Sequence, residues 1–187
     1  MSKNIVVKAD QKRVVPVIWT GNESEIEYDI KLAGRGAEVT LLMLLFGDGN
    51  KNLATNINVL HDAPDTKSRV VVKGALNDAS HVDFEGLVKI EPGAKHANAW
   101  LAAHLLLLSE QAGGRAVPKL EITENDVKAG HASTVGKVND MELFYLMSRG
   151  LSKEASTGLI VQGFLESLLS EFPIKDAVSA RKKLKWL

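Results

Sequence analysis

Residues 105–172 read LLLLSEQAGGRAVPKLEITENDVKAGHASTVGKVNDMELFYLMSRGLSKEASTGLIVQGFLESLLSEF, and the pattern of this stretch changes in its middle. Up to about Val138, short apolar runs are broken by glycine, proline and acidic residues, which is typical of β-strands joined by turns. After Val138, apolar residues recur every three or four positions, which predicts helices. We therefore divide the chain into a β domain, residues 1–138, and a helical segment, residues 139–187.

The residues before this stretch continue the β pattern. Short apolar or alternating runs recur at irregular intervals of about 10–16 residues, without an exact repeat. They are Ile5–Val7, Val14–Ile18, Ile26–Leu32, Val39–Phe46, Ile57–Leu60, Val70–Val72, Val82–Phe84 and Leu87–Ile90. By pattern alone, this spacing fits a sandwich, a barrel or a solenoid about equally well. Gly34–Gly36 and Gly47–Gly49 lack the spacing of a phosphate-binding loop and are predicted to be turns.

Caps, stops and a helix-breaking proline divide the C-terminal segment into three predicted helices. These are a helix from Met141 to Ser148 capped by Asn139 or Asp140 and stopped by Gly150, a helix capped by Ser152 and interrupted by Pro173, and a helix from Ile174. We expect the three helices to cap the open end of the β domain. The basic cluster Arg181–Lys185 is predicted to be solvated at the end of the last helix, where the helix dipole favours positive charge.

Composition narrows the class of protein. The 187 residues suffice for one substantial core, and 45% hydrophobic with 25% charged residues is ordinary for a globular protein. The 23 basic and 23 acidic residues balance, so no charge signature for nucleic acid or an anionic membrane is visible. The longest uninterrupted apolar run, Leu41–Phe46, is far shorter than the roughly 20 residues of a membrane helix. We expect a soluble, cytoplasmic protein.

The chain contains no cysteine. This excludes disulfides, thiolate metal ligands and cysteine nucleophiles within the sequence.

Several motifs together resemble one family. Val127–Gly136, which reads VKAGHASTVG, and Leu143–Leu151, which reads LFYLMSRGL, resemble the C-terminal signature of SufB/SufD proteins of iron–sulfur cluster assembly. Leu105–Ser109, Pro118–Ile122 and Asp126 precede the signature in the same order. Weaker matches lie upstream, at His61–Pro64, Ser68, Lys73–Gly74 and Phe84–Gly86. The chain is most similar to the SufD side of the family, although full-length members are about twice as long and carry an additional N-terminal helical region.

The resemblance implies the fold and the function. It favours a right-handed β-helix, a single-stranded solenoid, with a helical C-terminal cap. It implies a non-enzymatic scaffold that docks a SufC-like ABC ATPase through its helical C-terminus and pairs with a SufB-like protein or with itself. The unpaired last strands near Leu120 and Ile122 are the expected dimer edge. No tightly bound cofactor is expected, although iron or an iron–sulfur cluster could be held transiently at a subunit interface.

His131 occupies the histidine position of the family signature and is the first candidate for a site near the cluster. An imidazole can ligate iron when it is deprotonated and oriented by a hydrogen bond. The alternative is a histidine with a structural hydrogen bond at the last turn. The family's thiolates are missing, because Ala129 and Ala103 stand where SufD-like and SufB-like chains respectively carry cysteine. Alanine cannot replace a thiolate nucleophile, so this chain cannot accept a persulfide. Gly130 and Ala132 also stand where SufB-like chains flank the histidine with glutamates.

The remaining histidines are spread over different predicted turns. In a stacked solenoid, distant residues can meet, so His104 and His131 could approach each other and hold a metal. The others are His61, His81 and His96. His96 and His104 are eight residues apart, a spacing that would suit a helix, but their surroundings are typical of strands and turns. The sequence places no pair of carboxylates among Glu110, Glu121, Glu124 and Asp126 at a defined separation.

The first predicted helix offers the second candidate site. In the family this region docks the ATPase, and aromatic residues with arginine dominate binding hot spots. We expect Tyr145, Arg149 and the turn from Leu151 to Glu154 to contact the partner. We expect Phe144 to be part of the core.

Two alternative functions remain open. The missing thiolates suit a structural or metal-handling homodimer that has lost its ATPase partner. A β-helix carbohydrate-active enzyme is the more remote alternative, because no acidic constellation is recognisable.

Overall fold

The computed structural model describes residues 2–184 and contains two parallel sheets of five strands each. One, sheet A, has the order β1 (Ser2–Val7), β3 (Glu25–Leu32), β5 (Asn52–His61), β7 (His81–Ile90) and β9 (Gly113–Ile122). The other, sheet B, has the order β10 (Lys128–Lys137), β8 (Asn98–Leu107), β6 (Lys67–Leu76), β4 (Glu38–Gly47) and β2 (Lys12–Trp19).

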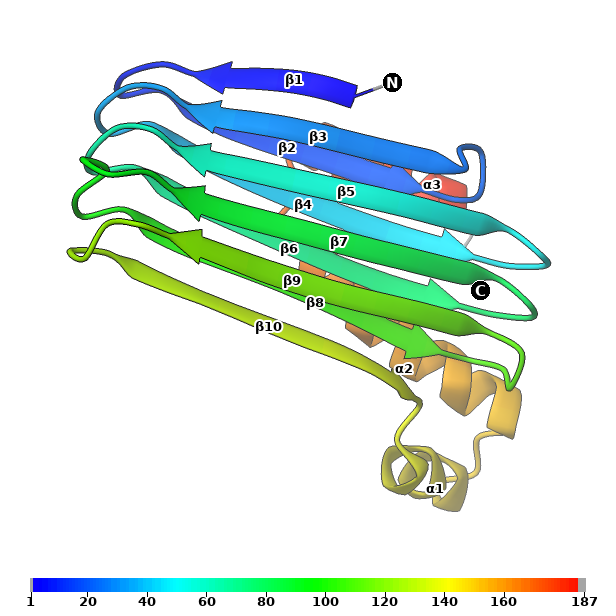
Figure 1. Cartoon of the computed structure of the whole chain (residues 1–187). Helices are drawn as coiled ribbons and strands as arrows, with labels where there is room; N and C mark the ends of the chain where they lie inside the picture. The colour runs from blue at the N-terminus through cyan, green and yellow to red at the C-terminus, as the bar shows by residue number, and fades with distance from the viewer. Residues whose placement is uncertain (1, 185–187) are drawn as a thin grey trace.

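Odd-numbered strands belong to sheet A and even-numbered strands to sheet B, so the chain crosses from one sheet to the other after every strand (Figure 1). Two successive strands make one turn of the solenoid. This arrangement is a β-helix, as the family resemblance predicted; the sandwich and the barrel, which the spacing left open, are wrong.

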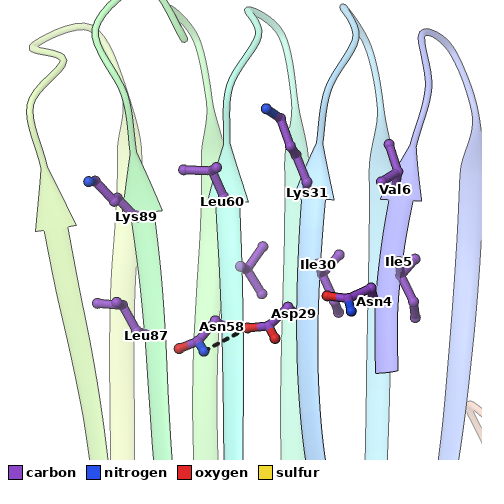
Figure 2. Close-up of a pocket in the computed structure, with 11 residues that line it drawn as sticks. Asn4, Ile5, Val6, Asp29, Ile30, Lys31, Asn58, Leu60, Leu87 and Lys89 are labelled. Atoms are coloured by element: carbon purple, nitrogen blue, oxygen red, sulfur yellow. Dashed lines mark hydrogen bonds between the residues drawn. The ribbon is translucent and has the colours of Figure 1, made fainter. Parts of the chain in front are cut away.

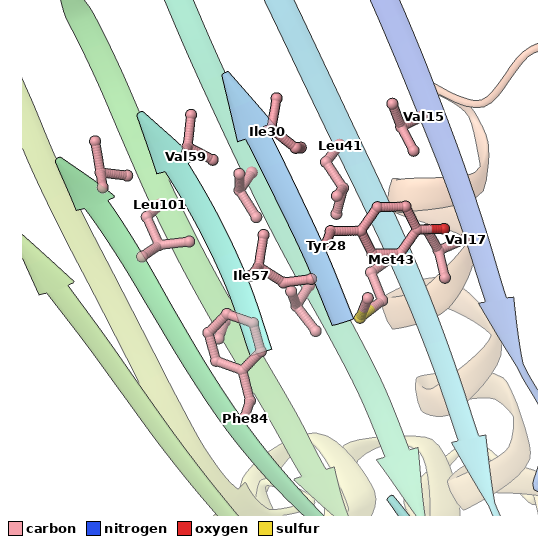
Figure 3. Packing of buried hydrophobic residues seen from close by; sticks show 14 of the residues in the cluster. Val15, Val17, Tyr28, Ile30, Leu41, Met43, Ile57, Val59, Phe84 and Leu101 are labelled. Carbon is pink, nitrogen blue, oxygen red and sulfur yellow. The ribbon is translucent and has the colours of Figure 1, made fainter. Parts of the chain in front are cut away.

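Inward-pointing side chains stack in rows from one turn of the β-helix to the next. On sheet B, Leu41 is in register with Val70, and Val70 with Leu101, so that one row of side chains points inward from three neighbouring strands. All three are fully buried. Figure 3 shows such rows meeting those of sheet A, with Phe84 filling the space between them. The rows explain why the repeat is hard to see in the sequence: any apolar residue can occupy a row as long as the register holds.

Both predicted glycine turns are confirmed. Gly36 and Gly49 have φ angles of 69° and 63°. This left-handed conformation is easily adopted by glycine, which has no Cβ.

The three helices form where their caps predict. They are α1 (Asp140–Ser148), α2 (Lys153–Leu169) and α3 (Ile174–Leu184). The Asn139 side chain accepts hydrogen bonds from the first amides of α1, and Ser152 accepts one from Ala155. Gly150, between α1 and α2, has a φ of 95°. Of the predicted basic cluster, Lys182 and Lys183 are exposed, whereas Lys185 lies outside the described residues.

The expected position of the helices was wrong. Buried residues of α2 and α3, such as Leu165 and Ala180, pack against Leu42, Leu44 and Val71 on the outer face of sheet B. Leucine and valine are found on this outer face because the two helices cover it. Helices α2 and α3 therefore lie along the side of the β-helix. The hydrophobic cluster that they cover contains no residue of the last turn, β9 and β10.

Candidate functional site

The last turn of the β-helix exposes side chains that would be core residues in any other turn. On β10, His131 is in register with Leu101 of β8, which is fully buried in the core. Because residues in register on adjacent strands share a face, His131 lies on the inward face of sheet B. No further turn follows in the described chain, and His131 is exposed. The candidate histidine therefore stands at the open end of the core.

His104 lies on the other face of the same sheet. It is in register with Thr134 of β10, three residues beyond His131, and its Nδ1 is 2.9 Å from the Thr134 hydroxyl. Residues three apart on a strand point to opposite faces. The predicted approach of His104 and His131 does not occur, so this pair does not form a metal site.

The surroundings of His104 also favour its neutral form. Burial lowers the pKa of His104, and the neighbouring charge of Lys73 lowers it further. The Lys73 ammonium lies 3.2 Å from the carbonyl oxygen of Phe164 and 4.7 Å from the centre of its ring. This cluster fastens α2 to sheet B.

His61 has a structural role that the sequence did not indicate. It is fully buried, and its two ring nitrogens each lie 2.8 Å from a hydroxyl, of Thr66 and of Ser68. Burial lowers the pKa of His61 to about 4. Thr66 lies in the corner after β5, and Ser68 lies on β6. In the sequence, the only sign of these two contacts is their spacing of five and seven residues from His61.

The four carboxylates that the sequence could not place are separate in the structure. Glu121 pairs with Lys89, Glu124 accepts the amide of Gly93, and Asp126 contacts His96. Glu110 lies 3.8 Å from Lys137. Across residues 2–184, no three His, Asp or Glu side chains gather in a way that could hold a metal ion.

A shallow groove crosses the outer face of sheet A, opposite the helices. It has a volume of about 380 Å³, and Leu60, Leu87 and Lys89 are among its lining residues (Figure 2). Its one carboxylate, Asp29, accepts hydrogen bonds from Asn58 at 2.9 Å and Ser2 at 2.6 Å. Hydrogen bonds from Ser2 and Asn58 lower the pKa of Asp29. A carboxylate held in this way is a structural link between strands rather than a proton donor.

The predicted dimer edge lies on the open end. Leu120 of β9 packs against the rim of the core, and Ile122 is 41% exposed. Strand β9 pairs only with β7, and β10 only with β8. Within the described residues, both strands therefore keep one free edge of backbone donors and acceptors, which is the usual template for strand pairing.

The second candidate region, α1, is unusual in having no buried residue. Phe144 is 69% exposed, so its prediction as a core residue is wrong. Tyr145 is 56% exposed, and the Arg149 guanidinium lies 5.2 Å from the centre of its ring. Met141 and Leu151 are also exposed. Several large apolar side chains of α1 and the turn after it are therefore exposed, which makes this region a candidate binding surface.

A groove lies between α1 and α2. It has a volume of about 440 Å³ and is lined by Met141, Glu142, Tyr145, Leu146, Leu159 and Ile160. The predicted contact Glu154 lies nearby in sequence, in the first turn of α2. Hydrogen bonds from its own backbone amide and from Ser152 lower the pKa of Glu154. The structure thus brings Tyr145 and Arg149 together, and it adds an adjoining apolar groove that the sequence did not reveal.

None of the described helices is both long enough and apolar enough to cross a membrane.

The fold defines a class, a parallel β-helix whose last turn and first helix are exposed. Residues 3–164 match the family model for the SufBD core domain of the SUF system of FeS cluster assembly. The chain belongs to the SufBD family.

Named relatives agree with this assignment. The iron–sulfur cluster assembly protein SufD of Bacillus subtilis is 36% identical over 171 residues, which cover 83% of this chain and 39% of the relative. A SufBD family protein of Mycobacterium leprae is 34% identical, covering 87% of this chain and 43% of the relative. One of Staphylococcus saprophyticus is 32% identical, covering 83% and 33%. The chain therefore spans less than half the length of each of these relatives.

Proposed function

We propose that this chain is a non-enzymatic scaffold of iron–sulfur cluster assembly that docks a SufC-like ABC ATPase through α1 and the start of α2. The single observation that carries the proposal is that α1 forms a capped helix, yet buries none of its side chains. Family membership supports the process, since the matching model is described by FeS cluster assembly. The ATPase partner is the one that the resemblance of α1 to the family signature implies.

The chemistry of α1 suits a protein partner. Phe144 and Met141 offer large apolar side chains, and Tyr145 with Arg149 offers a stacked aromatic–cation pair beside the groove. Aromatic residues and arginine dominate the binding energy of measured interfaces, and aromatic side chains bury a large area. Glu142 and Glu154 would form the polar rim.

The open last turn is the proposed site for a second subunit. A SufB-like protein or a second copy of this chain would cover the exposed inward face of β9 and β10, including Leu120 and Ile122. Covering this face would bury His131 at the interface, where its imidazole could contact iron or a cluster as transient cargo. As part of the same proposal, we expect this scaffold to act in the cytoplasm.

The docking experiment uses the whole chain and the purified SufC-like ATPase of the same organism, with and without ATP. We expect Phe144→Ala and Arg149→Glu each to weaken binding about tenfold or more, because each removes a central contact. The control is Lys182→Glu, a charge reversal at an exposed position of α3, which should bind like the unaltered chain.

Two outcomes would contradict the proposal. Equal binding by all three variants would place the ATPase on another surface. Absence of binding by the folded, unaltered chain would favour the detached homodimer, which a measurement of molar mass in solution would then identify.

A further inference from the structure

A column of alternating charges runs along one corner of the β-helix. The Arg35 guanidinium lies 3.1 Å from the Asp65 carboxylate, and the same carboxylate lies 2.9 Å from Nδ1 of His96. Nε2 of His96 lies 3.0 Å from the Asp126 carboxylate. These four residues belong to the corners before β4, β6, β8 and β10, respectively. The column therefore links four successive turns and ends on the last one.

The backbone of His96 places it at a recurring corner position. His96 has a φ of 61°, in the left-handed region, where histidine and aspartate occur more often than most residues with a side chain. The equivalent positions of the two preceding turns hold Asp65 and Gly36. The amide of His96 donates to the carbonyl oxygen of Asp126 at 2.6 Å, so the ring and the backbone hold the same residue of the last turn.

Only one protonation state of His96 satisfies both of its contacts. A neutral imidazole has one donor nitrogen and one acceptor nitrogen, whereas an imidazolium has two donors. Here both ring nitrogens face carboxylate oxygens, of Asp65 and of Asp126, which only accept. A neutral ring would therefore turn a lone pair toward one of the two carboxylates.

We propose that His96 is a pH-sensitive clasp on the corner formed by residues 123–127, between β9 and β10. The protonated ring closes the clasp by donating to both Asp65 and Asp126. The neutral ring has no charge and can donate to only one of the two carboxylates, so its hold on Asp126 weakens. Asp65 keeps its ion pair with Arg35, whereas within residues 2–184 Asp126 has no cation other than His96 within 4.0 Å. The last turn of the β-helix is thereby held more tightly at this corner when the ring is protonated than when it is neutral.

The other charged groups around the clasp do not replace His96. On the same turn as His96, Lys95 lies near Glu124 of the last turn, and it acts on that carboxylate. Glu124 is already bound to the amide of Gly93 at 2.9 Å. Since the His96 and Asp126 side chains are 60% and 66% exposed, solvent screens their attraction, and the effect of the clasp is local. The inference does not depend on the docking proposal, because it concerns a corner of the fold and not a partner.

Hydrogen exchange at individual amides tests the clasp in the whole chain. The reporters are the amides of His96 and Lys128, which donate to Asp126 and Ala97, and the reference is that of Lys67, which makes the same kind of bond to Ala37. Protection factors, corrected for intrinsic exchange, should fall about two- to fivefold at the reporters between about pH 5.5 and about pH 8, because a solvent-exposed ion pair is lost. The reference amide should not change.

Two substitutions separate the clasp from other causes. His96→Asn keeps a residue that tolerates the left-handed conformation but does not titrate, and Asp126→Asn removes one carboxylate at constant size. Each should abolish the pH dependence at the reporters, whereas His81→Asn, on β7, should retain it. An unchanged pH dependence in His96→Asn and Asp126→Asn would overturn the proposal. So would the absence of any pH dependence in the unaltered chain, a result that does not require any variant to fold.

Discussion

Helices α1 and α2 follow each other in the chain and begin with the same kind of cap, but they differ in what they bury. Helix α2 buries Val161, Leu165, Leu168 and Leu169 together with Ser156, whereas α1 buries nothing. The histidines repeat this contrast, because His61 lies fully buried in a middle turn and His131 is exposed on the last turn. The middle of the molecule thus buries its side chains, whereas α1 and His131 of the last turn stay exposed.

The largest expected effect tests this contrast by cavity formation. Leu165 is fully buried between α2 and sheet B, so Leu165→Ala should lower the free energy of unfolding by about 2–5 kcal/mol. Met147 of α1 is 43% exposed, and Met147→Ala should change the free energy of unfolding by about 0.5 kcal/mol or less. Urea unfolding followed by circular dichroism measures both. A similar loss in both variants would mean that α1 contributes to the core after all.

The next effect concerns pH and compares the two histidines. Burial lowers the pKa of His61 to about 4, so the folded state binds fewer protons than the unfolded state between that pKa and the ordinary value of 6.5. The stabilising effect of a neutral His61 is fully present above about pH 6.5 and is lost as the pH falls toward about 4. The free energy of unfolding should fall by about 3 kcal/mol across this window.

Matched variants assign that pH dependence. Unfolding in urea at several pH values should show a flatter dependence in His61→Gln, which can still bond to Thr66 or Ser68 but does not titrate. His131→Gln, at the open end, should follow the unaltered chain. If His61→Gln kept the full dependence on pH, another group would be responsible.

The contrast also explains which parts of the structure the sequence could predict. Local signals were sufficient for the helices, because Asn139, Ser152 and Gly150 act on their immediate neighbours. They could not place the helices, since the apolar pattern that includes Phe144 shows that a face exists but not what covers it. The β-helix itself came from family resemblance, because the strand spacing is irregular.

Which residues meet across neighbouring turns depends on the register of the strands, and the sequence does not determine that register. His104 and His131 lie on neighbouring strands, but their register puts them on opposite faces of sheet B, and a shift of one residue would have reversed one of them. The contact between His96 and Asp126 likewise joins residues about one turn of the solenoid apart. Without a visible repeat, nothing in the sequence aligns these two positions.

The smallest expected effect compares the two helix caps. The Ser152 side chain accepts the amide of Ala155, and loss of such a cap costs about 1 kcal/mol, so Ser152→Ala should lower the free energy of global unfolding by about that amount. The side chain of Asn139 makes the equivalent bond to Met141 at 2.9 Å, but α1 can fray while the rest of the chain stays folded. Asn139→Ala should therefore speed hydrogen exchange in α1 about fivefold and leave global unfolding unchanged, because the cap energy is lost locally. Urea unfolding together with hydrogen exchange distinguishes the two, and a global loss of stability in Asn139→Ala would show that α1 unfolds with the core and not ahead of it.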